Sequence, residues 1–115
     1  MKKSLLVFLS ICPIVLYGQV NLVPNPSFEE HVGCPFNQGE LNLCIGWNYL
    51  LPNGGQSDFF HQCDTTELQG VPVNEGGSQN AFDGVAYAGI YCYIAVGEIR
   101  DYLQIELTQS LVFGK

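Results

Sequence analysis

Hydrophobic and polar residues alternate most clearly in the segment 85–96. Aliphatic and small side chains occupy one set of alternate positions, at Ala88, Ile90, Cys92, Ile94 and Val96. Tyrosines occupy the other set, at Tyr87, Tyr91 and Tyr93. A period of two predicts a β-strand with an inward aliphatic face, which includes Cys92, and a face on which the tyrosines lie together.

A second strand is predicted over 102–108, because Leu103, Ile105 and Leu107 alternate there with tyrosine or polar residues. This pattern is typical of a sheet with one buried and one solvated face. Phe59 and Phe60 lie in another short β-rich run. Since they are adjacent, we expect one of them to point inward and the other outward.

Turn-forming residues divide the rest of the chain into short segments. They cluster at 52–55, 70–72, 74–77 and 83–84, and β-rich runs lie between them. No segment after residue 18 has sustained helical periodicity. The pattern predicts an all-β sandwich, either a jelly-roll or an immunoglobulin-like fold.

The first 18 residues have the pattern of a secretory signal peptide. Lys2 and Lys3 form a short cationic region, an apolar run follows, and Gly18 provides a small residue at the end. The run is too short for a membrane helix, which needs about 20 apolar residues. We expect a signal peptide over 1–18, a β-sandwich domain over 19–115, and an exported protein outside the cell, on its surface, or in the periplasm or outer membrane.

The mature chain is strongly acidic. The whole sequence has a formal net charge of −7, and loss of Lys2 and Lys3 with the signal peptide makes it −9. Nucleic acid and anionic membranes are poor partners for such a surface, because phosphate binding depends on Lys and Arg. The acidity suits solubility outside the cell. The alternative is that some carboxylates hold Ca²⁺, which prefers oxygen ligands.

Four cysteines remain after residue 18, namely Cys34, Cys44, Cys63 and Cys92. An even number in an exported protein predicts two disulfides, whose pairing the sequence leaves open. A Cys34–Cys63 bridge would close a loop of about 30 residues, which is worth roughly 3 to 4 kcal/mol in the chain-entropy model. A zinc site that uses His61 is the rival, but no Cys-x-x-Cys spacing is present.

Aromatic side chains are the clearest candidates for ligand contact. Tyr87, Tyr91 and Tyr93 would offer flat apolar area with hydroxyl groups, which suits the face of a sugar ring. Trp47 could also stack on a sugar. A single tryptophan that follows glycine at the start of a strand is more often part of the core, and we favour that interpretation.

No motif indicates catalysis. Glycoside hydrolysis requires two carboxylates about 5 to 9.5 Å apart, and nothing selects a pair from the 11 acidic residues. The Gly-x-Ser-x-Gly motif of hydrolases and the phosphate-binding glycine loops are absent. His31 and His61 are the only imidazole bases, and both lie near cysteines that we expect to be oxidised. The sequence therefore indicates a protein that is not an enzyme.

Six short motifs occur in a recognisable order along the mature chain. They are residues 25–29 (Asn-Pro-Ser-Phe-Glu), 46–47 (Gly-Trp), 57–63 (Ser-Asp-Phe-Phe-His-Gln-Cys), 70–72 (Gly-Val-Pro), 86–89 (Ala-Tyr-Ala-Gly) and 102–104 (Tyr-Leu-Gln). In this order they resemble a family of exported domains of Bacteroidetes-type bacteria. The resemblance implies a galactose-binding-like jelly-roll, related in shape to carbohydrate-binding modules.

The resemblance also implies a position in a larger protein. Such domains commonly lie at the N-terminus, ahead of an outer-membrane-protein-A-like domain or a secretion-sorting domain. In the family, the segment that corresponds to 111–115 is followed by further core strands, so we expect a truncated domain. An acidic residue near Glu29 often helps to hold a structural calcium ion in these modules. The alternative is that Glu29 and Glu30 form a solvated pair at the start of a loop.

Three functional hypotheses follow. The first is a non-catalytic exported module that binds a polysaccharide or surface glycan through the tyrosine face. The second is a structural or spacer domain that contacts other domains of an envelope protein and has no sugar ligand. The third is a fragment associated with a glycoside hydrolase. Only the analogy of fold indicates sugar, and fold does not determine function.

Overall fold

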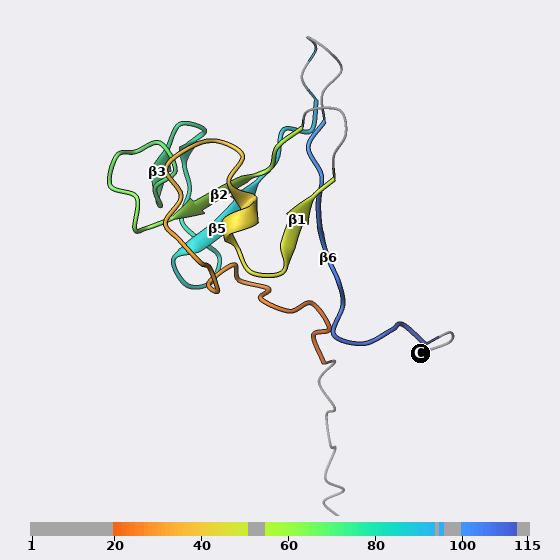
Figure 1. Cartoon of the computed structure of the whole chain (residues 1–115). Helices are drawn as coiled ribbons and strands as arrows, with labels where there is room; N and C mark the ends of the chain where they lie inside the picture. The colour runs from red at the N-terminus through yellow and green to blue at the C-terminus, as the bar shows by residue number, and fades with distance from the viewer. Residues whose placement is uncertain (1–19, 51–54, 94, 96–99, 113–115) are drawn as a thin grey trace, which may run out of the picture.

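The computed structural model describes residues 20–50, 55–93, 95 and 100–112 (Figure 1). Within them the strands are β1 (Trp47–Tyr49), β2 (Asp58–His61), β3 (Val73–Asn74), β4 (Gly77–Ser78), β5 (Ala86–Gly89) and β6 (Leu103–Ile105). A single 3-10 turn, η1 (Leu41–Leu43), is the only helical element of this part of the chain. The predicted all-β class is confirmed. The predicted signal peptide over 1–18 lies outside the described residues.

The strands form three antiparallel pairs, β2 with β5, β1 with β6, and β3 with β4. In Figure 1 the β2–β5 pair lies between the β3 hairpin on one side and the β1–β6 pair on the other. Strands β1 and β6 are distant in sequence but lie side by side, with Trp47 opposite Ile105. Three such pairs establish the all-β class and do not by themselves define a jelly-roll. None of the described residues belongs to a helix with the length and hydrophobicity of a membrane span.

The core lies on one face of the β2–β5 pair and extends to β1. Its buried members are Leu41, Cys44, Trp47, Phe59 and Ala86. The Trp47 ring stacks on Phe28 with centroids 4.7 Å apart, and its Nε1 donates a hydrogen bond of 2.9 Å to the carbonyl of Asn25. A buried tryptophan whose N–H is satisfied is a core residue. Trp47 therefore has no free face for a ligand.

Strand β5 ends at Gly89, so the prediction of a strand that runs on to residue 96 is wrong for residues 90–93. The cause is the partner strand, because β2 begins at Asp58, which lies opposite Gly89. The alternating pattern no longer controls burial after the pairing stops. Ile90 is 47% exposed, and Cys92 is exposed and does not point to the core. The last two aliphatic positions of the pattern, Ile94 and Val96, lie outside the described residues.

The alternation predicted for the second strand is confirmed. Leu103 and Ile105 in β6 are half-buried and Gln104 between them is exposed. The same alternation continues past the strand, where Glu106 is exposed and Leu107 is half-buried. Here the pattern succeeds because β1 provides a partner along the whole of β6.

Candidate functional site

The second face of the β2–β5 pair forms one wall of an open cleft with a volume of about 410 Å³. Successive residues of a strand point to opposite sides of a sheet, so Phe59 faces the core while Asp58 and Phe60 face this cleft. The β3–β4 hairpin and the residues after β5 form the other walls. We call this space the Tyr87 cleft; its polar and aromatic lining comes from Asp58, Asn74, Glu75, Gln79, Tyr87 and Tyr91.

Phe60 and Tyr87 contribute adjacent rings to one wall of the Tyr87 cleft. They lie directly opposite each other on β2 and β5, with ring centroids 5.0 Å apart. Gly89 makes room for the Phe60 ring, because a Cβ at that position would lie 2.6 Å from Phe60 Cε2. Phe60 is only 6% exposed. Phe59 and Phe60 point to opposite faces of the strand, as expected, but the outward ring of Phe60 is not on the surface, because the walls of the cleft cover it.

Asn74 fixes the Tyr87 ring as a wall of the cleft. Its Nδ2 donates hydrogen bonds to the Tyr87 hydroxyl at 2.5 Å and to the Gly70 carbonyl at 3.1 Å. Its Oδ1 accepts the N–H of Gly76 at 3.0 Å, which closes the turn between β3 and β4. Gly77 follows with φ of 136°, a value that favours glycine. The predicted turn over 74–77 thus positions a side chain that lines the cleft.

Tyr91 lies at the rim of the cleft beyond the end of β5. Its N–H donates to Asp101 Oδ2 at 2.8 Å, and its carbonyl accepts the N–H of Asp101 at 3.0 Å. The structure therefore brings Tyr87 and Tyr91 into one cleft. Tyr93 is not among the lining residues; the guanidinium of Arg100 lies 5.8 Å from its ring centroid instead.

The cleft is acidic. Burial raises the pKa of the Asp58 carboxyl, and the nearby Glu75 and Asp101 carboxylates add to this increase; a 2.6 Å hydrogen bond from the Gly39 N–H opposes it. Asp58 and Glu75 both line the cleft, and none of the described residues that line it is cationic. A neutral or cationic polar ligand fits this environment, and an anion does not.

Sequence reasoning missed Asp58, Asn74 and Glu75 as lining residues. The sequence did contain a signal for Asp58, because it has the same parity as Phe60 and so shares its face of β2. Asn74 and Glu75 lie in a segment interpreted only as a turn. Their approach to Tyr87 depends on contacts between distant segments, which no local pattern reveals.

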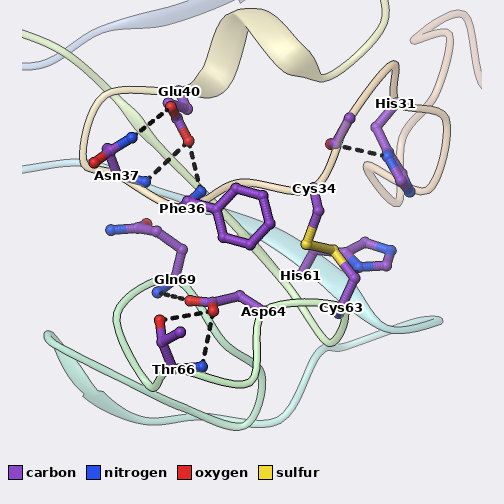
Figure 2. Close-up of a disulfide and its surroundings, with 11 residues drawn as sticks. His31, Cys34, Phe36, Asn37, Glu40, His61, Cys63, Asp64, Thr66 and Gln69 are labelled. Carbon is purple, nitrogen blue, oxygen red and sulfur yellow. Dashed lines mark hydrogen bonds between the residues drawn. A yellow bond between two sulfur atoms is a disulfide. The ribbon is translucent and has the colours of Figure 1, made fainter.

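A disulfide joins Cys34 to Cys63, one of the pairings open to the sequence (Figure 2). The second predicted disulfide is absent, because Cys44 and Cys92 are both free. Cys44 is buried in the core, where its Sγ accepts a hydrogen bond of 3.2 Å from Asn25 Nδ2. Cys92 is exposed because β5 has already ended. The two remaining thiols therefore have different environments and no contact that could pair them.

Glu29 and His61, the residues considered above for calcium and zinc, have contacts within the protein. Glu29 Oε1 accepts the backbone N–H groups of Val85 at 2.8 Å and Ala86 at 3.0 Å. The rings of His31 and His61 lie next to each other, with centroids 4.4 Å apart. Among the described residues no group of three or more His, Cys, Asp or Glu side chains is placed to hold a metal ion. The zinc alternative thus finds no ligand set there, and the calcium site stays a prediction.

The comparisons with known proteins add no relative. No protein-family model matches the chain, and neither a curated protein nor a solved structure has significant similarity to it. Function must therefore be argued from the cleft itself.

Proposed function

We propose that this protein is a non-catalytic, exported module of the galactose-binding-like jelly-roll type, which binds a neutral carbohydrate in the Tyr87 cleft. The observation that carries the proposal is the joint presence of two tyrosines and several polar side chains in one open cleft. Small-molecule sites combine an apolar surface with a few well-placed polar groups in this way.

The chemistry of the lining favours sugar over other ligands. The rings of Tyr87 and Tyr91 offer flat apolar surfaces to the C–H face of a pyranose. Asp58, Asn74 and Glu75 offer acceptors for its hydroxyl groups, and the Tyr87 hydroxyl, which accepts from Asn74, can donate its own O–H. Because none of the described lining residues is cationic, phosphorylated and uronic-acid ligands are disfavoured.

Two features support export. The Cys34–Cys63 disulfide is consistent with an oxidising compartment, and the first 18 residues have the composition of a signal peptide. The resemblance to exported Bacteroidetes-type domains agrees with both. An extracellular or cell-surface position would give the cleft access to polysaccharide.

A structural or spacer role is the second candidate, and exposed apolar side chains favour it. Phe82 is fully exposed, and Leu111 and Val112 are 77% and 66% exposed. Surfaces of this kind can pack against neighbouring domains of an envelope protein. The binding experiment described next separates this role from carbohydrate binding.

The test is an array of plant, algal and bacterial polysaccharides probed with the purified protein. We expect selective, saturable binding that Tyr91→Ala weakens by at least about tenfold, which corresponds to about 1.4 kcal/mol. Tyr102→Ala is the matched control, because Tyr102 is equally exposed and lies outside the cleft. Tyr91→Phe should retain binding by stacking. The absence of binding across the array would support the spacer role, and release of reducing ends from a bound glycan would support a hydrolase.

A further inference from the structure

A second cleft adjoins the Tyr87 cleft and shares Glu75 with it. Its volume is about 470 Å³, and its lining includes Phe36, Asn37, Gln38, Gln56 and Gln69. We call it the Gln69 cleft. Carboxamides and one carboxylate dominate its polar surface, and Phe36, which is 55% exposed, provides an aromatic face.

Gln69 has an unpaired acceptor in this cleft. The residue is 0% exposed, and its Nε2 donates a hydrogen bond of 3.0 Å to Glu75 Oε1. A carboxylate only accepts hydrogen bonds, so this contact fixes the orientation of the amide. Gln69 Oε1 is then buried without a partner among the described residues. Buried polar atoms are nearly always hydrogen-bonded, so this oxygen calls for a donor.

The Glu75 carboxylate lines both clefts and accepts hydrogen bonds from two glutamines. Its Oε1 accepts from Gln69, and its Oε2 accepts from Gln38 Nε2 at 2.7 Å. Both amides therefore direct their N–H groups at Glu75 and keep a carbonyl oxygen each. A ligand rich in hydroxyl groups would supply the donor that Gln69 Oε1 lacks once a small movement of the cleft wall uncovers this buried oxygen, and its C–H surface can lie on Phe36.

The walls of the Gln69 cleft are held in place before a ligand arrives. Figure 2 places Phe36 on one loop and Gln69 on the facing loop, with the Cys34–Cys63 disulfide between these loops. On the first loop Glu40 accepts the N–H of Phe36 at 2.7 Å. On the second loop Asp64 accepts the N–H of Gln69 at 2.7 Å. Such preorganisation reduces the entropy cost of binding.

We propose that the Gln69 cleft is a second sugar subsite, so that the protein recognises an extended neutral oligosaccharide that crosses Glu75. This inference rests on the proposed function of the Tyr87 cleft and deepens it. The ligand is a chain of several sugar units, with one unit against Tyr87 and Tyr91 and another against Phe36 and Gln69. A single sugar would occupy either cleft weakly, and a chain would bind both together.

The test uses side-chain amide signals in nitrogen-15 NMR spectra of the purified protein. Asn74 and Gln79 report on the Tyr87 cleft, and Gln38 and Gln69 report on the Gln69 cleft. The probes are glucose, mannose, cellohexaose and mannohexaose. We expect a hexasaccharide to shift both sets of signals, and we expect both sets to reach half of their full shift at the same hexasaccharide concentration. Shifts at Asn74 and Gln79 alone would overturn the second subsite and leave the proposed function standing, because the donor to Gln69 would then be a buried water. No shift in either set would count against both proposals.

A variant provides an independent readout. Phe36→Ala removes an exposed ring, so it should leave the fold intact, and Phe82→Ala is the control because Phe82 is fully exposed and lines neither cleft. We expect Phe36→Ala to weaken hexasaccharide binding by about tenfold or more while the response of Asn74 to the monosaccharide stays unchanged. An equal affinity for the hexasaccharide in both variants would overturn the proposal.

Discussion

The carboxylate of Glu29 accepts a hydrogen bond of 3.0 Å from the backbone N–H of Ala86, the first residue of β5. The same oxygen accepts the N–H of Val85 at 2.8 Å. These contacts tie the N-terminal segment to the strand whose outer face lines the Tyr87 cleft. Gly84 packs against this carboxylate with φ of 67°, and a Cβ there would overlap the Glu29 side chain.

Loss of the Glu29 carboxylate should destabilise the protein. Glu29→Ala leaves two N–H groups without their charged acceptor, so we expect a loss of about 1.5 to 3 kcal/mol in the free energy of unfolding. Glu29→Gln keeps an acceptor oxygen and should lose about 1 kcal/mol. Urea unfolding measures both. Glu30→Ala is the control, because that side chain is exposed; an equal loss in the control would contradict the structural role.

The same variants test the calcium site. If Ca²⁺ raises the unfolding midpoint of the native protein and leaves that of Glu29→Gln unchanged, then Glu29 is a calcium ligand, as the family resemblance implies. An unfolding midpoint that is the same with Ca²⁺ and with a chelator would exclude the calcium site.

In a protein produced without residues 1–18, which include Cys12, the two free thiols of the described residues should differ in reactivity. Burial, together with the Glu29 and Glu30 carboxylates, raises the pKa of the Cys44 thiol to about 11. The thiolate is the reactive form, so Cys44 should react with dithiobis(nitrobenzoate) only after unfolding, whereas exposed Cys92 reacts in the folded protein. Cys92→Ser should remove the fast reaction alone. A denatured protein without any reactive thiol would instead mean that Cys44 and Cys92 are bonded.

Removal of the Cys34–Cys63 disulfide should lower stability substantially. The bond joins residues separated by 29 positions, and closing such a loop in the unfolded chain is worth about 3 to 4 kcal/mol. We expect the double variant with Cys34→Ser and Cys63→Ser to unfold at a lower urea concentration by a corresponding amount. Cys92→Ser is the matched control, and equal midpoints for the two proteins would disprove the contribution.

Stability should fall as the pH drops below 6.5, the usual pKa of histidine. Burial and the neighbouring His31 lower the pKa of His61 from its usual 6.5, although Glu29 opposes the change. Neutral His61 Nδ1 also accepts the N–H of Cys63 at 2.9 Å. The unfolded chain binds the proton more readily than the folded protein. The contribution of neutral His61 to the free energy of unfolding is therefore complete above pH 6.5, and it is lost as the pH falls towards the lowered pKa of His61 in the folded protein.

Urea midpoints measured between about pH 7.5 and 5 would reveal this dependence. His61→Asn keeps an acceptor for the Cys63 N–H and cannot titrate. We expect its midpoint to vary less over this interval than that of the native protein. Identical slopes for the two proteins would assign the dependence to other groups.

The sequence predicts the structure well where a strand has a partner along its whole length. Leu103, Gln104 and Ile105 follow the predicted alternation because β1 pairs with each of them. The prediction fails after Gly89, although the alternation continues in the sequence. Pairing decides where a strand ends, and the partner of β5 starts at Asp58. A pattern within one segment contains no information about that boundary.

The candidate site was predictable only in part. The alternation predicts that Tyr87 and Tyr91 share one face, and both line one cleft. The position of Tyr91, however, depends on Asp101 and not on a strand. The even number of cysteines suggested a second disulfide, which would need Cys44 and Cys92 to approach each other. Burial of Cys44 in the core and exposure of Cys92 separate them.

The Cys34–Cys63 bond has a consequence for when recognition becomes possible. The two loops that it joins contribute Phe36 and Gln69, so the rim of the Gln69 cleft is completed by an oxidation and not by translation alone. A chain with reduced thiols would have both loops but no covalent link to hold their spacing. If the Gln69 cleft is the subsite proposed above, ligand binding by such a chain would depend on an oxidising environment.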